Sequence, residues 1–280
     1  KNMLLLFLFA FPSVAQEITI PMIRTVYPVK CVTWNKDGTT FAYSEGENII
    51  VRDSTGYNLI QTLVNSHGNI DFLLYPQSTA GVGMDQLLSL SDENYMDFRI
   101  LPQTESIQSS KRNTLPKTTA LAYNYNGNYI AIGTEAGEIS VLLQNYLTNN
   151  FIEREITKLD ATISSLYFSR NNKLLVSGSD DDSACIWEVA TGKLLNALPY
   201  YSRSHVPVLI TNDNNYIIMT TAQNVLGIFD MNFRKIREIR TEADIQSIHL
   251  SSDGKTVIIL TSQNFFYFYD IASAKVTGYV

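Results

Sequence analysis

The chain has 280 residues, of which 45% are hydrophobic and 17% are charged, and its formal net charge is -6. This hydrophobic fraction excludes the low-hydropathy, highly charged compositions of disordered chains. No run of Lys or Arg exceeds two residues, so the basic surface of a nucleic-acid-binding protein is missing and we expect no nucleic-acid partner. The 16 Tyr and 13 Phe favour pleated, half-buried surfaces and predict a single large all-β domain.

The first predicted element is a secretory signal peptide over residues 1–15. Lys1 precedes the apolar run 3–11, and the small residues Ser13 to Ala15 follow, as in signal peptides that are cleaved after the last of them. Nine apolar residues are too few to span a bilayer, which takes about 20, so we expect no membrane span. The sequence therefore predicts a periplasmic or secreted protein whose mature part is residues 16–280.

A segment that recurs six times decides the predicted architecture: an apolar strand, a polar turn, and a second apolar strand. The last residues of its first strands are Trp34, Leu74, Tyr123, Phe168, Ile210 and Leu250. The spacings between them are 40, 49, 45, 42 and 40 residues, a period typical of propeller blades. A ring of such sheets covers faces that one sheet alone cannot bury. We therefore expect a β-propeller of six four-stranded blades.

The strands inside the repeats follow from apolar runs between polar turns. The fourth repeat predicts strands at 163–169, 173–179, 183–189 and 193–198. Continuous apolar residues in the third strands indicate burial on both faces; these strands are predicted at 48–53, 95–100, 138–143, 225–231 and 265–271.

Segments 17–24 and 274–280 both read as outer strands. Either the first of them is an additional edge cover, or the native chain continues past residue 280 into a seventh blade.

Residues 177–195, and less closely 133–142, resemble the WD-repeat family of propellers. The resemblance extends from about residue 29 to residue 280. It implies that Trp187 stands at the family's Trp position, with Ser177 and one of Asp180 to Asp182 at the Ser and Asp positions behind it. The family's Gly-His pair is missing before the first strands, so we expect that its hydrogen-bond network is not retained.

Segments 32–44 and 249–260 are also similar, more weakly, to the periplasmic propeller of the Tol system, through a short Asp-Gly turn that follows a first strand. Both resemblances imply a surface that docks a protein or peptide, and not an enzyme. The alternative is a propeller hydrolase or lyase that acts on a carbohydrate through carboxylates at the central channel.

The predicted docking surface lies at the turns between second and third strands and at the connections from fourth to first strands. Aromatic residues and Arg are enriched among binding hot spots. The candidate residues are Tyr27, His67, Lys117, Asp181, Tyr200, Tyr201, Arg203 and Gln223. The alternative interpretation is that they are solvated loop residues.

No metal site or cofactor is predicted. The acidic run Asp180 to Asp182 is read as a hydrated turn in preference to a calcium site, because Ca²⁺ takes about six to eight oxygen ligands. The three His residues lack metal-ligand spacing. Cys31 and Cys185 fall in well-separated blades, so we expect two buried free thiols.

Overall fold

The computed structural model describes residues 3–5, 22–35, 37–64, 67–75, 86–101, 108–111, 116–145, 150–181, 183–199, 207–251 and 253–279. Every regular element in these ranges is a β-strand. The chain divides into two compact units, the first made of residues 1–75 with 81–113 and the second of residues 76–80 with 114–280. Each unit is described by itself.

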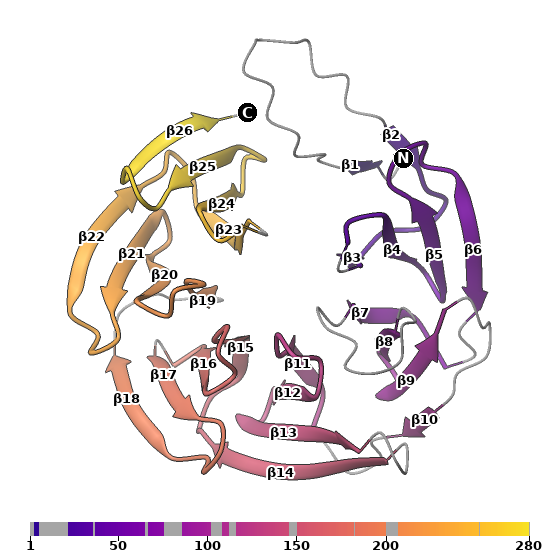
Figure 1. Cartoon of the computed structure of the whole chain (residues 1–280), viewed down its shortest axis with the longest axis horizontal. Coiled ribbons are helices and arrows are strands. Elements are labelled where there is room, and N and C mark those ends of the chain that lie inside the picture. The colour runs from indigo at the N-terminus through magenta and orange to yellow at the C-terminus, as the bar shows by residue number, and fades with distance from the viewer. Residues whose placement is uncertain are drawn as a thin grey trace. The chain divides into compact units, whose positions relative to one another are not determined.

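The first unit contains one two-stranded sheet and two four-stranded antiparallel sheets (Figure 1). The two-stranded sheet pairs β1 (Met3–Leu5) with β2 (Met22–Arg24). The first four-stranded sheet contains β3 (Val32–Trp34), β4 (Thr40–Glu45), β5 (Asn48–Asp53) and β6 (Leu59–Val64). The second contains β7 (Ile70–Leu74), β8 (Gln86–Ser91), β9 (Tyr95–Ile100) and β10 (Gln108–Lys111).

The second unit contains four four-stranded antiparallel sheets, each built from consecutive strands. The third sheet contains β11 (Thr118–Tyr123), β12 (Tyr129–Thr134), β13 (Glu138–Asn145) and β14 (Asn150–Lys158). The fourth contains β15 (Ile163–Phe168), β16 (Leu174–Ser179), β17 (Ser183–Glu188) and β18 (Leu194–Pro199). The fifth contains β19 (Val208–Ile210), β20 (Tyr216–Ala222), β21 (Val225–Asp230) and β22 (Lys235–Arg240). The sixth contains β23 (Ile245–Leu250), β24 (Thr256–Thr261), β25 (Phe266–Asp270) and β26 (Lys275–Tyr279).

These six sheets confirm the predicted six four-stranded blades. The six first strands end at the predicted residues, Trp34, Leu74, Tyr123, Phe168, Ile210 and Leu250. The predicted burial of the third strands is confirmed for β9, β17 and β21, which are buried at four, four and five consecutive residues. It is wrong for β25, where only Tyr269 is buried. The sixth sheet has its own fourth strand, in agreement with the outer strand expected at 274–280.

The other predicted outer strand, 17–24, is described only from Met22 onward, as β2. Its Ile23 packs against Phe41, Tyr43 and Ile50 of the first sheet. Apart from Met3 to Leu5, the predicted signal peptide lies outside the described residues.

A repeated turn explains why the first strands end where they do. In five sheets the residue after the first strand accepts a hydrogen bond, through its side-chain oxygen, from the backbone N–H five residues later; these residues are Asn35, Asn124, Ser169, Thr211 and Ser251. The residue three positions later has a positive φ, between 57° and 73°, and is Gly or Asn each time. Only these residue types adopt that conformation at low cost, so the sequence fixes the turn locally.

The core of the second unit lies between successive sheets. Trp187 and Phe168 of the fourth sheet pack with Val141 and Ala131 of the third. Phe229 and Ile217 of the fifth sheet pack with Ile186 of the fourth. Successive sheets of this unit therefore bury their facing sides against each other, which is the physical reason for the repeat.

Candidate functional site

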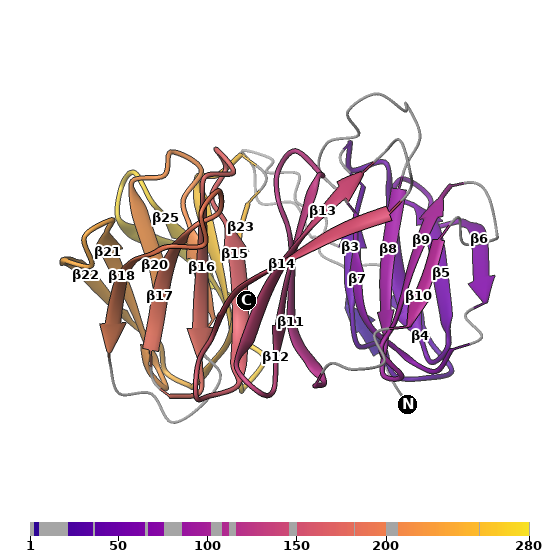
Figure 2. The same cartoon turned by 90° about the horizontal axis from the view of Figure 1, so that it is seen from below.

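The two ends of each sheet carry different connections (Figure 2). The loop end is defined here as the turns between second and third strands together with the connections from fourth to first strands. The turn end is defined as the remaining turns. At the loop end of the second unit, the described connecting residues are 116–117, 135–137, 159–162, 180–181, 207, 223–224, 241–244 and 262–265.

Hydrogen bonds to backbone carbonyls join the loop end of the second unit into a continuous run across the third and fourth sheets. The Glu135 N–H donates to the Lys117 carbonyl at 2.9 Å, and the Thr162 hydroxyl donates to the Glu135 carbonyl at 3.2 Å. The Asp180 N–H then donates to the Thr162 carbonyl at 3.0 Å. This run brings the predicted residue Lys117 into one bonded surface with the turn that carries the predicted residue Asp181.

Gly137 allows the turn between β12 and β13 to lie close to the connection between β14 and β15. Its φ is +83°, and its N–H donates to the Thr134 carbonyl at 3.1 Å. A Cβ atom at this position would lie 1.9 Å from the carbonyl oxygen of Leu159. Only glycine therefore allows the third sheet's turn to approach the connection to the fourth sheet this closely.

The structure places the other predicted residues of the second unit as follows. Asp181 caps its own turn, because its Oδ1 accepts hydrogen bonds from the Ser179 hydroxyl and, at 3.0 Å, from the Ser183 N–H. Gln223 is exposed, and its carbonyl accepts from the Ile245 N–H at 2.6 Å. Tyr200, Tyr201 and Arg203 lie outside the described residues.

The connecting residues at the two ends of the second unit differ in the sign of their charge. At the loop end the described, exposed acidic residues are Glu135, Asp160, Asp180, Asp181, Glu242 and Asp244, and Lys117 is the basic one. At the turn end the described basic residues are Arg170, Lys173, Lys193, Arg234 and Lys255, and the acidic ones are Asp213 and Asp253. The loop end of this unit is therefore an acidic surface, which attracts basic partners and raises their association rate.

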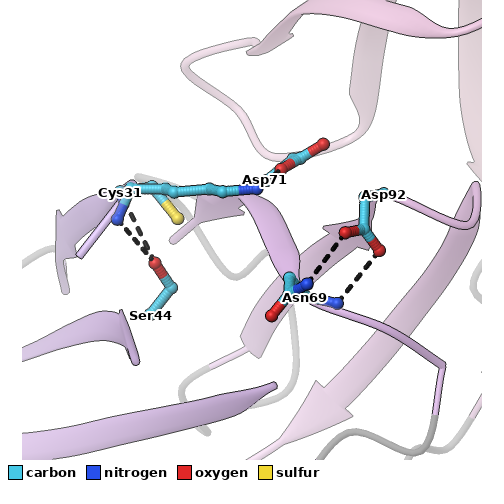
Figure 3. A network of polar contacts seen from close by, with 6 residues as sticks. Cys31, Ser44, Asn69, Asp71 and Asp92 are labelled. Atoms are coloured by element: carbon cyan, nitrogen blue, oxygen red, sulfur yellow. Dashed lines mark hydrogen bonds and ion pairs between the residues drawn. The ribbon is translucent and has the colours of Figure 1, made fainter. Parts of the chain in front are cut away.

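At the loop end of the first unit, polar side chains pair with one another (Figure 3). The Lys30 ammonium donates to Asp71 Oδ1 at 2.5 Å, and this hydrogen bond is the main reason why the pKa of Lys30 is raised. Asn69 donates to Asp92 through its N–H and its amide, both at 3.0 Å. The Tyr27 side chain is 56% exposed. The Lys30–Asp71 pair joins the first two sheets, and the exposed Tyr27 lies beside Gly46 of the turn between β4 and β5.

His67, also predicted as a docking residue, covers a buried ion pair. Its ring stacks on Tyr95 at 3.8 Å between centroids, and its Nδ1 is 3.9 Å from Asp97 Oδ2. Asp97 lies 3.5 Å from the Arg99 guanidinium, and both residues are at most 4% exposed. Burial lowers the pKa of Arg99, and the charge of Asp97 opposes that effect. Asp97 and Arg99 lie two residues apart on β9 and therefore point to the same face of the second sheet.

Trp187 anchors the fourth sheet through a buried hydrogen bond. Its indole Nε1 donates to the Ser177 hydroxyl at 2.9 Å, and the two residues are 3% and 1% exposed. The expectation that no part of the family's hydrogen-bond network is retained is therefore wrong for this pair. It is correct for Asp181, whose described partners are in its own turn. Arg99 holds the equivalent register position in the second sheet: it is opposite Leu87 as Trp187 is opposite Leu175, and it donates to Ser89 at 2.9 Å.

Comparisons with known proteins agree with this architecture. A family model described as the NWD2 C-terminal beta-propeller matches residues 154–277. Retinoblastoma-binding-like protein E of Dictyostelium discoideum is 26% identical over 155 residues, and the COMPASS component SWD3 of Saccharomyces cerevisiae is 23% identical over 202 residues, or 71% of the chain. These matches support a β-propeller of the WD-repeat kind.

A further relative is the Retinoblastoma-binding protein 5 homolog of Drosophila melanogaster, 31% identical over 106 residues and 35% of the chain. The matched segments span 28%, 19% and 48% of the three relatives, in the order Dictyostelium, Drosophila and yeast. The likeness therefore supports a protein-interaction scaffold at the level of the family, with no reaction assigned.

No three His, Cys, Asp or Glu side chains in the described ranges converge as a metal site would require. In the same ranges no helix has the length and hydropathy needed to cross a bilayer. Both cysteines are free thiols, and burial raises the pKa of each to about 11.

Proposed function

We propose that this propeller is a non-catalytic scaffold that docks a protein or peptide on the loop end of its sheets, and that the segment docked on the second unit is basic. The observation that carries the proposal is the surface of six exposed acidic residues and one Lys at the loop end of that unit. A carboxylate surface of this kind complements Lys and Arg side chains and repels phosphate backbones.

The names of the relatives favour binding over catalysis, because they describe retinoblastoma-binding proteins and a component of an assembly. The hydrolase or lyase alternative is not favoured by any of them. The turns of the loop end are bonded to one another from Lys117 to Asp180 through backbone carbonyls. This preorganisation lowers the entropic cost of docking a partner.

Site-specific photo-crosslinking tests the proposed surface. A photoreactive amino acid at Gln223 would report contacts of the loop end, and the same amino acid at Asn232, an exposed residue of the turn end, is the matched control. We expect a specific protein adduct from position 223 and none from position 232. Adducts from position 232 alone would reject docking at the loop end.

The proposal includes export of the chain. It is supported by the apolar run 3–11 and the small residues Ser13 to Ala15 that follow it. Mass spectrometry of the protein isolated from cells tests this part separately: we expect a mature chain that begins at Gln16, and a chain that retains residues 1–15 would reject export by this signal.

A further inference from the structure

Four exposed basic side chains lie at the turn end of the fourth sheet and are defined here as the basic cluster: Arg154, Arg170, Lys173 and Lys193. The Val189 N–H donates to the Lys173 carbonyl and the Glu188 N–H donates to the Lys193 carbonyl, both at 2.9 Å. Lys173 and Lys193 therefore flank the end of β17, with their backbones two strand spacings, or about 10 Å, apart. Arg170 lies in the same turn as Lys173, between β15 and β16.

Arg154 joins the cluster from β14 of the third sheet. Its guanidinium donates to the Ala190 carbonyl at 2.5 Å and to the Val189 carbonyl. Both acceptors are neutral, so these hydrogen bonds hold the guanidinium beside the fourth sheet without compensating its positive charge. Glu153 and Glu155, its neighbours on β14, point to the other face of the strand, because successive side chains alternate between faces.

Little negative charge opposes the basic cluster. None of its four members forms an ion pair with a carboxylate in the described part of the chain. Among the described residues at the turn end of the fourth sheet, the carboxylate is that of Glu188, whose Oε2 accepts a hydrogen bond from the Thr191 hydroxyl at 2.5 Å. The cluster therefore presents a concentrated positive charge to solvent.

Tyr125 of the third sheet holds Arg170 in place. The guanidinium carbon of Arg170 lies 3.8 Å from the centroid of the Tyr125 ring, and its Nη2 donates to the Tyr125 hydroxyl at 2.9 Å. A guanidinium has five N–H donors, so donors remain that can bind a carboxylate through two parallel hydrogen bonds. Because the contacts with Tyr125 already order this side chain, binding a ligand costs less conformational entropy.

We propose that the basic cluster binds an acidic segment of a protein partner. Arg170 pairs with one carboxylate of the segment, and the two Lys residues pair with others. An extended segment repeats its same-face side chains about every 7 Å, so Asp or Glu at every second position can reach both Lys173 and Lys193. This surface goes beyond the acidic loop end: it lies at the opposite end of the second unit, has the opposite charge, and is apart from Asn232 of the fifth sheet.

The basic cluster fits a short acidic peptide better than a nucleic acid. Proteins bind single strands by stacking bases on aromatic side chains, and Arg170 already lies over the Tyr125 ring. Duplex DNA is held through many phosphate contacts along an extended basic surface, whereas the cluster is confined to one end of one sheet. The net charge of -6 also repels a long polyanion that extends past the cluster.

Fluorescence anisotropy of the full chain with a labelled peptide of alternating Glu and Gly tests this surface. We expect saturable binding that weakens as salt is added, and no binding of the same peptide with Gln in place of Glu. The double variant Arg170→Gln, Lys193→Gln should weaken binding of the Glu peptide about five- to tenfold, because two ion pairs with the ligand are lost.

The matched control is the double variant Arg234→Gln, Lys255→Gln, which removes one exposed Arg and one exposed Lys from the turn ends of the fifth and sixth sheets. It should change the affinity less than about twofold, since screened charges outside the contact contribute little. Failure of the Glu peptide to bind at low salt would overturn the proposal. Equal losses in the two double variants would also overturn it, because they would show attraction by net charge alone. Tighter binding of an oligothymidylate of the same charge, lost in the Arg170→Gln, Lys193→Gln variant, would assign the cluster to nucleic acid instead.

Discussion

The hydrogen bond between Trp187 and Ser177 yields the most informative stability prediction, because it links strands β17 and β16 inside the core of the second unit. Trp187→Phe removes the indole N–H and part of the ring from a site that is 3% exposed. The lost hydrogen bond costs about 1 kcal/mol, and the space left in the core costs about 1–2 kcal/mol more. We expect the free energy of unfolding to fall by about 2–3 kcal/mol.

A double-mutant cycle isolates the hydrogen bond from the change in volume. Ser177→Ala leaves the buried indole N–H without its acceptor, which costs about 1–3 kcal/mol. Because both single variants break the same bond, the double variant should lose about 1 kcal/mol less than the sum of the two. The measurement is urea unfolding followed by far-UV circular dichroism, with amide exchange of β16 and β17 as an independent report on the second unit.

Trp34→Phe provides the matched control for this cycle. Trp34 is half-buried in the first unit and packs against Phe41, with ring centroids 5.0 Å apart. Combined with Ser177→Ala, it should show additive effects, since the two residues belong to different compact units. A coupling between Trp187 and Ser177 smaller than about 0.3 kcal/mol would refute the reasoning that this bond stabilises the fourth sheet.

Three further predictions concern the loop end, the repeated turns and the buried thiols. Gly137→Ala should destabilise the chain by at least about 2 kcal/mol in the same unfolding assay, because φ is +83° and the new Cβ meets the Leu159 carbonyl; an unchanged midpoint would contradict the close approach. The pKa of Asp253 is lowered, chiefly by the hydrogen bond from the Ser251 hydroxyl, so the carboxylate stabilises the fold above its unfolded pKa of about 3.9 and this contribution is lost as the pH falls below that value. Asp253→Asn should therefore weaken the dependence of the free energy of unfolding on pH between about pH 4 and pH 2. The same pH dependence in variant and wild type would contradict a stabilising role of the Asp253 carboxylate. Cys185, with a pKa of about 11, should react with a thiol reagent at pH 8 only after unfolding in urea, whereas fast labelling of the native chain would show that the thiol is accessible.

The sequence predicted the ends of the first strands to the residue because the signal is local. In each described turn one polar side chain and one Gly or Asn, three positions apart, close the turn. The contacts between strands carried no such signal. The hydrogen bond from Arg99 to Ser89 depends on the register of β8 and β9, and the bond from Trp187 to Ser177 depends on the pairing of β16 with β17.

The candidate surface was predicted in part for the same reason. Turn positions in the sequence located Lys117, Asp181 and Gln223 at the loop end, where the structure has them. The acidic character of that end became visible only when the structure placed Asp160, Glu242 and Asp244 in connections of the loop end. Charge that is spread over several connections becomes a surface only when the sheets are folded.

The most direct test of the proposed docking surface is the affinity of a captured partner for charge-neutralised variants. One variant carries Glu135→Gln, Asp160→Asn and Asp244→Asn at the loop end; the matched control carries Lys173→Gln, Lys193→Gln and Lys255→Gln at the turn end. Titration calorimetry at two salt concentrations should show weaker binding and a smaller salt dependence for the loop-end variant, and wild-type behaviour for the control. Unchanged affinity of the loop-end variant, or loss of binding in the control alone, would contradict docking on the acidic loop end.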